Sequence, residues 1–498
     1  MKQVGKRGAL ALTVGLGLVA ACSSSSSPGT TTSGSDGSAS HCYGGFPPPP
    51  SGTISGTEGD GGAAGTLKTF SCPSDPGANG FLFSASGEVN AIVGYPYPPY
   101  DPSQTWMVDG WNWKIEKYIV VIDHITLWSD PNVSSSNQEM HGSQVAHVDG
   151  PFVIDLHKGG PLDGKGGGGE QALAIAALVN QNDNGGAAFD PTQDYAFGFS
   201  TVPATYGAIN VNLDSSEAAD FQYMVDHSAT VYYYGSASWT GNQPGQSGFG
   251  LCSSNPQTDY SDGNQTCAAA GSASGDGGPG DDGGAEGEDA AAAAGSSSCP
   301  NPYNFAQLPQ QMTFQFAFST PTNYVNCDNY SLSEQLGMTV RGVQASPSES
   351  EVEQVTVHMD HPFWESFEED TPVHWDQIAA QYVGQTNPVA HLEDFIGVPF
   401  HPFTDHDGTV MPWHNCEPTY YSAPGLGAMS FSTLSVPIDP TGTCTGPVGV
   451  DFTSPMDNCP AIRDYYDFIR YTQSTQGHLN SQGLCYIDRQ FPSPAGGS

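Results

Sequence analysis

Residues Lys117–Leu127 read KYIVVIDHITL, a run dominated by β-branched and aromatic residues. Such residues favour the pleated, half-buried surface of a β-strand. Five further runs of this kind are bounded by Gly, Pro, Asn or Asp: Pro151–Leu156, Ala208–Leu213, Thr230–Ser238, Met312–Ser319 and Val352–Asp360. Many short strands joined by turn residues predict a mainly β protein with a β-sandwich-like body.

Helix signals are fewer. Ser215–His227 begins with a Ser cap, Pro372–Val383 has a proline near its first turn, and Ala461–Ser474 has apolar residues at helical spacing. Glu170–Asn180 fits a strand hairpin running into Tyr195–Thr201 about as well as it fits a helix. We therefore expect a few short helices on the β body, with an α+β arrangement of the C-terminal third as the alternative.

The N-terminal segment predicts export. Basic residues are followed by the apolar run Ala9–Val19, and Ala20 and Ala21 stand directly before Cys22. This pattern is typical of a signal peptide over residues 1–21, and its end resembles the lipobox of bacterial lipoproteins. We expect cleavage before Cys22, acylation of that thiol, and anchoring to a membrane of the cell envelope, with the outer membrane favoured.

Composition narrows the partners. The chain has 12 Lys and Arg against 52 Asp and Glu, a formal net charge of −40. Nucleic-acid binding depends on basic residues that replace phosphate counterions, so that class is excluded. We expect the protein to associate with the membrane through the lipid on Cys22. Whether it also binds a protein or a carbohydrate is not decided by the composition. Trp111 and Trp113 fit either a carbohydrate-stacking face or core packing, which is the usual role.

Cysteine usage predicts a disulfide framework. Of eleven cysteines, ten remain once Cys22 is set aside, and in an exported chain an even number indicates bridges. The candidates are Cys42, Cys72, Cys252, Cys267, Cys299, Cys327, Cys416, Cys444, Cys459 and Cys485. Their pairing cannot be deduced from the sequence.

Low-complexity stretches divide the chain. Residues 22–66 are rich in Ser, Gly, Thr and Pro and predict a flexible tether, and residues 268–298 predict a disordered acidic loop. Between and after them we expect a β-rich domain over 67–267 and a β-rich second half with helices over 299–498. The sequence leaves open whether these are one body or two.

Histidines concentrate in the second half. Seven of the fourteen fall within 57 residues that begin at His358, and residues 355–364 read VTVHMDHPFW. The period of two along a strand would place His358 and Asp360 on one face. Pro362 would end the strand and turn the ring of His361 toward the same side.

This pattern predicts one transition-metal site. His374, on the next expected helix, is the fourth candidate, so the predicted ligands are His358, Asp360, His361 and His374. Imidazoles with a carboxylate suit zinc first. In the alternative interpretation, His358 and Asp360 only hydrogen-bond to each other and to the backbone. Asp405–Thr409 looks like the start of a calcium loop but lacks the required Gly and Glu positions, so calcium is expected less than zinc.

Several short segments lie along most of the chain from residue 80 onward: Val108–Trp111, Gly150–Gly160, Asp194–Phe199, Ser319–Cys327, His358–Ser366 and Ser474–Asn480. They include DGW, GPFVIDLHKGG, HMDHPFWES and STQGHLN. Together with the lipobox they resemble uncharacterised myxobacterial lipoproteins. The resemblance implies secretion and one joint architecture, and no catalytic role.

The sequence thus favours a lipid-anchored exported protein acting as a ligand-binding or metal-binding module. One alternative is a zinc-dependent hydrolase in which the metal activates water and Glu365 or Asp360 handles the proton. Another is a structural or adhesive surface protein. No catalytic residue is assigned.

Overall fold

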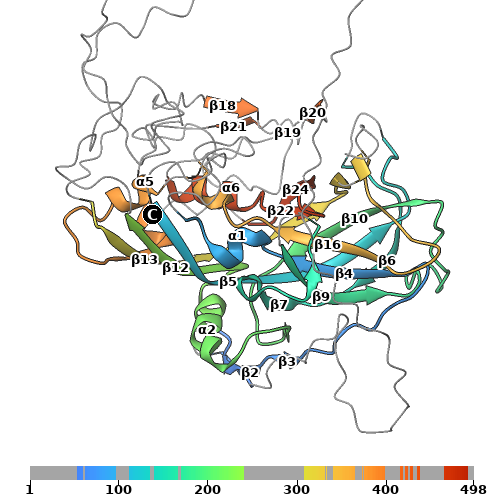
Figure 1. Ribbon diagram of the computed structural model, residues 1–498, viewed down its shortest axis with the longest axis horizontal. Coiled ribbons are helices and arrows are strands. Elements are labelled where there is room, and N and C mark those ends of the chain that lie inside the picture. Colours follow the sequence, from blue (N-terminus) through green and yellow to red (C-terminus); the bar gives the residue numbers. More distant parts are fainter. Residues whose placement is uncertain are drawn as a thin grey trace, which may run out of the picture. The chain divides into compact units, whose positions relative to one another are not determined.

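The computed structural model in Figure 1 describes the following residues: 53–59, 62–96, 111–134, 139–165, 170–239, 308–330, 332–333, 340–364, 373, 375–396, 398 and 465–491, with the backbone of four short strands between 415 and 437. The predicted signal peptide, the lipid site Cys22 and the acidic loop 268–298 lie outside them. In the described part of the chain, no helix is both long enough and apolar enough to span a membrane.

The larger sheet has twelve strands. Its main path runs β17 (Val389–His391), β13 (Gln311–Phe318), β12 (Val231–Trp239), β5 (Trp111–Trp128), β10 (Asp194–Thr201), β14 (Thr322–Val325) and β24 (Tyr486–Arg489). The strands off this path are β3 (Lys68–Thr69), β6 (Gln144–Val148), β7 (Phe152–Asp155), β11 (Ile209–Asn210) and β15 (Val343–Gln344). Most neighbours in the main path pair antiparallel.

The second sheet has six strands in the order β23 (Gly483–Leu484), β22 (Gly477–Leu479), β16 (Glu351–Val357), β4 (Phe81–Ser86), β9 (Gln171–Leu178) and β8 (Leu162–Asp163). Its central pair, β4 and β16, is parallel and joins the two halves of the chain. Because strands from both halves enter both sheets, residues 67–267 and 299–498 share one body.

The two sheets pack face to face around an aromatic core. The rings of Phe83 in β4 and Phe197 in β10 have centroids 5.9 Å apart, and Phe81 meets Tyr195 edge-on at 6.3 Å. The same buried cluster contains Trp111 and other side chains from both sheets. This arrangement confirms the predicted mainly β, sandwich-like fold.

Strand β5 shows how the sequence produces that core. Tyr118, Val120 and Ile122 face the core between the sheets, whereas Ile119 and Val121 join a second buried cluster on the opposite face. Register shifts against β12 and β10 interrupt this alternation. Further inward residues stand before the first shift and after the second: Trp111, Trp113, Ile115, Ile125 and Leu127. The bulges let eighteen residues keep one face inward.

Trp111 and Trp113 are completely buried. They pack edge-on against Trp239 and Trp375 respectively. The two tryptophans therefore fill the core, as the usual interpretation predicts, and form no carbohydrate-stacking face.

The second cluster corrects the predicted tether. β1 (Ser55–Thr57) and β2 (Ala64–Thr66) form a two-stranded sheet inside residues 22–66. Ile54 and Leu67, on either side of this sheet, are buried in the second cluster beneath α2 (Ala218–Asp226). Two apolar anchors suffice to order a segment whose average composition indicates a coil.

The remaining helices are short. They are α1 (Glu88–Val93), α5 (Asp376–Ala380), α6 (Tyr465–Gln473) and the 3-10 turns η1 (Leu156–Lys158), η2 (Ser215–Glu217), η5 (His361–Phe363) and η6 (Leu392–Phe395). The backbone-only strands are β18 (Asn415–Pro418), β19 (Tyr421–Ala423), β20 (Gly427–Met429) and β21 (Ser435–Pro437). Each of the three predicted helices thus contains an observed helix: η2 and α2 cover Ser215–Asp226, and α5 and α6 lie within the other two ranges.

The ambiguous segment Glu170–Asn180 is a strand. β9 pairs with β4 and β8 in the six-stranded sheet, whereas β10 belongs to the other sheet, so the two do not form the expected hairpin. The alanines of β9 are small enough to fit in this buried layer. The alternation of side chains along the segment could not specify which strand it pairs with.

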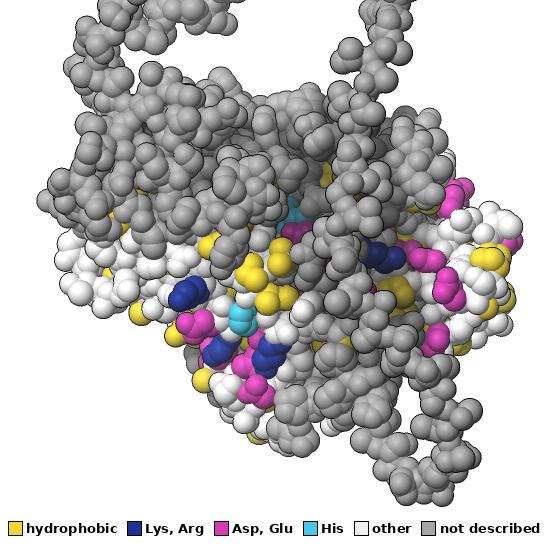
Figure 2. All heavy atoms as spheres, in the orientation of Figure 1, with side chains coloured by type: hydrophobic (Ala, Val, Ile, Leu, Met, Phe, Trp, Pro, Cys, Tyr) yellow, Lys and Arg dark blue, Asp and Glu magenta, His cyan; other side chains and the backbone are white. Residues whose placement is uncertain are grey.

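Charged side chains of both signs are interspersed on the face drawn in Figure 2, where basic side chains lie beside acidic ones. Around α2, Lys117 pairs with Asp220, and Lys158 pairs with both Asp214 and Glu217. The described lysines here are thus committed to local ion pairs, which fits the acidic composition.

The disulfide expectation is confirmed in part. Cys327 and Cys485 form a bridge across 158 residues, and Cys72 is also disulfide-bonded. The side chains of the other seven candidates lie outside the described residues.

Removing the Cys327–Cys485 bridge by a Cys327→Ala, Cys485→Ala double substitution should lower the free energy of unfolding by about 2 to 5 kcal/mol, because a long loop is no longer closed in the unfolded chain. Urea unfolding of both proteins measures this difference. Coincident unfolding curves would contradict this prediction.

Candidate metal centre

Three buried imidazoles meet where β16 ends. The strand stops at Val357, one residue before His358, and the chain then turns into η5, whose first residue is His361. His478 lies on the adjacent strand β22, opposite Thr356 in the ladder. The exposed fractions of His358, His361 and His478 are 5 %, 0 % and 1 %. A strand, a tight turn and a neighbouring strand thus bring the three side chains together.

The three rings are close enough to bind one small ion if their nitrogens move slightly toward one another. Ring centroids are 5.3 Å apart for His358 and His361, 4.1 Å for His358 and His478, and 5.4 Å for His361 and His478. One nitrogen from each ring lies within 4.8 Å of the other two. Around tetrahedral zinc, with Zn–N bonds of about 2.0 Å, ligand nitrogens stand about 3.3 Å apart. Small ring rotations would close the difference.

The tautomer of His361 follows from its neighbour Thr475, which lies just beyond α6. The Thr475 hydroxyl donates to the carbonyl of Thr472 at 2.7 Å, so toward His361 it acts as an acceptor. Its Oγ1 lies 2.7 Å from Nδ1 of His361, which therefore carries the ring proton. Nε2 of His361 then bears the lone pair, and this buried atom has no hydrogen-bond partner among the described residues.

His358 is oriented from the opposite side. Its Nε2 lies 2.8 Å from the carbonyl oxygen of Ser481, and because a carbonyl only accepts, Nε2 must carry the proton. In the neutral ring the lone pair is then on Nδ1. A metal-binding histidine commonly donates its other N–H to a carbonyl or carboxylate in this way.

Burial keeps two of the rings neutral. It lowers the pKa of His361 well below the usual histidine range, and the neighbouring His358 and His478 lower it further. Burial likewise lowers the pKa of His478 well below that range, with His358 adding to the effect. Neutral imidazoles are the form that binds transition metals.

The sequence identified part of this group. His358 and His361 come together as predicted, but the third member is His478 rather than Asp360. The strand ends before Asp360, whose Oδ2 accepts a hydrogen bond from Nε1 of Trp364 at 3.2 Å, so the expected shared strand face does not form. His374 lies outside the described residues, as do Glu365 and Asp405–Thr409. No local motif connects His478 to His358, because only strand pairing brings them together.

A second group of possible ligands is exposed at two of its three residues, with only Asp123 buried. It contains Asp123, His124 and Asp149. Nδ1 of His124 lies 3.1 Å from Asp149, and Nδ1 of the adjacent His147 lies 2.6 Å from Asp183. The hydrogen bond to Asp183 raises the pKa of His147. These rings are engaged in surface ion pairs, so this group is a weaker candidate than the buried histidines.

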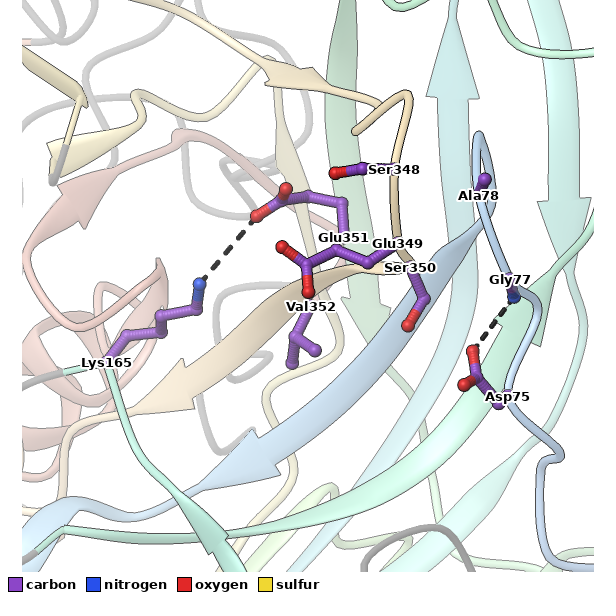
Figure 3. Close-up of a pocket in the computed structure, with 9 residues that line it drawn as sticks. All are labelled: Asp75, Gly77, Ala78, Lys165, Ser348, Glu349, Ser350, Glu351 and Val352. Carbon is purple, nitrogen blue, oxygen red and sulfur yellow. Dashed lines mark hydrogen bonds and ion pairs between the residues drawn. The ribbon is translucent and has the colours of Figure 1, made fainter.

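A polar pocket of about 470 Å³ lies at the other end of β16 (Figure 3). In it, Nζ of Lys165 is 3.9 Å from Glu351, with Glu349 on the same wall. None of the three buried histidines lines this pocket. Its one lysine faces acidic side chains, and it offers no set of metal-binding nitrogens.

Comparison of the chain with protein-family models, with curated proteins and with solved structures finds no match. The resemblance to myxobacterial lipoproteins stays a prediction. Chemical assignment therefore rests on the residues of the buried site.

Proposed function

We propose that the protein is a metal-binding module that holds one transition-metal ion, zinc first, through His358, His361 and His478. The observation that carries this proposal is the buried Nε2 of His361, which bears a lone pair and has no hydrogen-bond partner among the described residues. A buried polar atom without a partner is costly, and a metal ion would satisfy it.

The donor set selects the kind of metal. Three neutral imidazole nitrogens suit zinc and related transition ions, whereas calcium and magnesium prefer oxygen ligands. Three protein ligands also leave one coordination position for water or a bound ligand. The protein would therefore be a metal-binding module that is attached to the membrane through the lipid predicted at Cys22.

The hydrolase alternative is not proposed. It assigned proton transfer to Asp360 or Glu365. Asp360 is hydrogen-bonded to the indole of Trp364, and Glu365 lies outside the described residues. The geometry supports metal binding more directly than it supports catalysis.

Metal analysis of protein purified without a chelator or affinity tag tests the proposal. We expect about one equivalent of a transition metal, and near-complete loss in a His361→Ala, His478→Ala double variant. His227→Ala, directly after α2 and outside both groups, is the matched control and should retain the metal. His124→Ala tests the exposed group. Metal content far below one equivalent, or loss in His124→Ala alone, would contradict the buried site.

A further inference from the structure

Glu88 lies beside the proposed metal centre. It is the first residue of α1, which directly follows β4, the parallel neighbour of β16. Its Oε1 is 3.5 Å from Nε2 of His358 and accepts a hydrogen bond from Oγ of Ser481 at 3.1 Å. Only 18 % of its side chain is exposed. The carboxylate therefore faces the side of the His358 ring that carries the proton.

The backbone at this place is strained. Glu88 has φ +63°, Asn480 φ +53° and Ser481 φ +75°, all in the left-handed region. Only eight described residues other than glycine have positive φ, and three of them converge here. Asparagine tolerates this region, but glutamate rarely adopts it. Strain of this kind persists where the surrounding structure enforces it, and it clusters at functional sites.

Two of these strained residues, Glu88 and Ser481, approach the His358 ring. The carbonyl of Ser481 and the carboxylate of Glu88 both face the Nε2–H of His358, and the Ser481 hydroxyl donates to that carboxylate. A carboxylate on this side of a ligating histidine orients the ring and increases the basicity of the nitrogen that faces the metal. A helix-capping role would not require Glu88 to approach His358.

We infer that Glu88 is a positioning residue of the metal centre: it holds the His358 imidazole in the orientation that binds the ion. This inference rests on the proposed function of the site. Such carboxylates typically contribute a factor of about 10 to 100 in metal affinity. The strained backbone at Glu88 is then retained for binding and not for stability.

Two substitutions separate binding from stability. Glu88→Gln keeps the size of the side chain and removes its charge, whereas Glu88→Gly also relieves the positive φ. We expect both variants to bind zinc about 10-fold to 100-fold more weakly than wild type in a chelator competition. We also expect shifted visible absorption bands when cobalt(II) replaces zinc. The metal-free Glu88→Gly variant should unfold at the same temperature as wild type or higher.

Asn387→Gly is the matched control, because Asn387 has φ +47° on an exposed turn. It should retain full zinc affinity. Wild-type affinity and unchanged cobalt bands in both Glu88 variants would overturn the inference while leaving the metal site intact. Affinity that falls only in proportion to lost stability would overturn it as well. If wild-type protein takes up no zinc or cobalt, the proposed function fails and the inference fails with it.

Discussion

Saturating zinc should raise the midpoint of thermal unfolding by roughly 5 °C, and His478→Ala should abolish that rise. An ion that binds only the folded state stabilises it by about 4 kcal/mol at a concentration 1,000 times the dissociation constant. The unfolding entropy grows with chain length, so for a protein of this size each kcal/mol moves the midpoint by about 1 to 1.5 °C. Differential scanning calorimetry of chelator-treated protein, with and without added zinc, measures the effect.

His478 is the informative position because it comes from a different strand than His358 and His361. A site that uses all three rings should lose most of its affinity when His478 is removed. His227→Ala should keep the full zinc-dependent rise. An equal rise in His478→Ala and in wild type would place the ion elsewhere.

Glu353→Gln should remove a large part of the pH dependence of stability. Burial raises the pKa of Glu353 to about 8, although Nδ2 of Asn480 donates to its carboxyl at 2.5 Å. The folded state therefore holds this proton up to a higher pH than the unfolded chain, whose glutamate pKa is about 4.5. The stabilisation is complete below that value and is lost as pH rises toward 8.

The size of this effect follows from the shift. Each pKa unit corresponds to about 1.4 kcal/mol, so wild type should lose up to about 4 kcal/mol between pH 5 and pH 8 through this residue. Urea unfolding across that range should give a shallower slope for Glu353→Gln. Glu349→Gln, at an exposed position, should follow the wild-type slope. Equal slopes in all three proteins would show that Glu353 ionises without penalty.

Much of the fold was predictable from local patterns. Lys117–Leu127 lies within β5 because β-branched residues fit a strand buried on both faces. The full length of β5 was not predictable, since its register shifts against β10, β12 and β6 depend on the strands beside it. The two strands within residues 55–66 were also not predicted, because they depend on the packing of Ile54 and Leu67 into a cluster of residues distant in the sequence.

The candidate site divides in the same way. His358 and His361 are near neighbours in the chain, and Pro362 indicated that the strand ends in this region, although it already ends at Val357. The third ring belongs to His478, and the carboxylate beside the site belongs to Glu88. Asp360 does not belong to the group of three histidines, because the strand ends at Val357, where the backbone leaves the ladder.

The sequence by itself determined the mainly β character, the aromatic core residues and the histidine pair, because each depends on side-chain chemistry and spacing over a few residues. Tertiary structure alone decided which strands pair, that both halves of the chain share the two sheets, and that His478 and Glu88 lie beside His358. The physical reason is that strand pairing is made by backbone hydrogen bonds, which are the same for nearly every residue. Partner and register are therefore chosen by packing across the whole core.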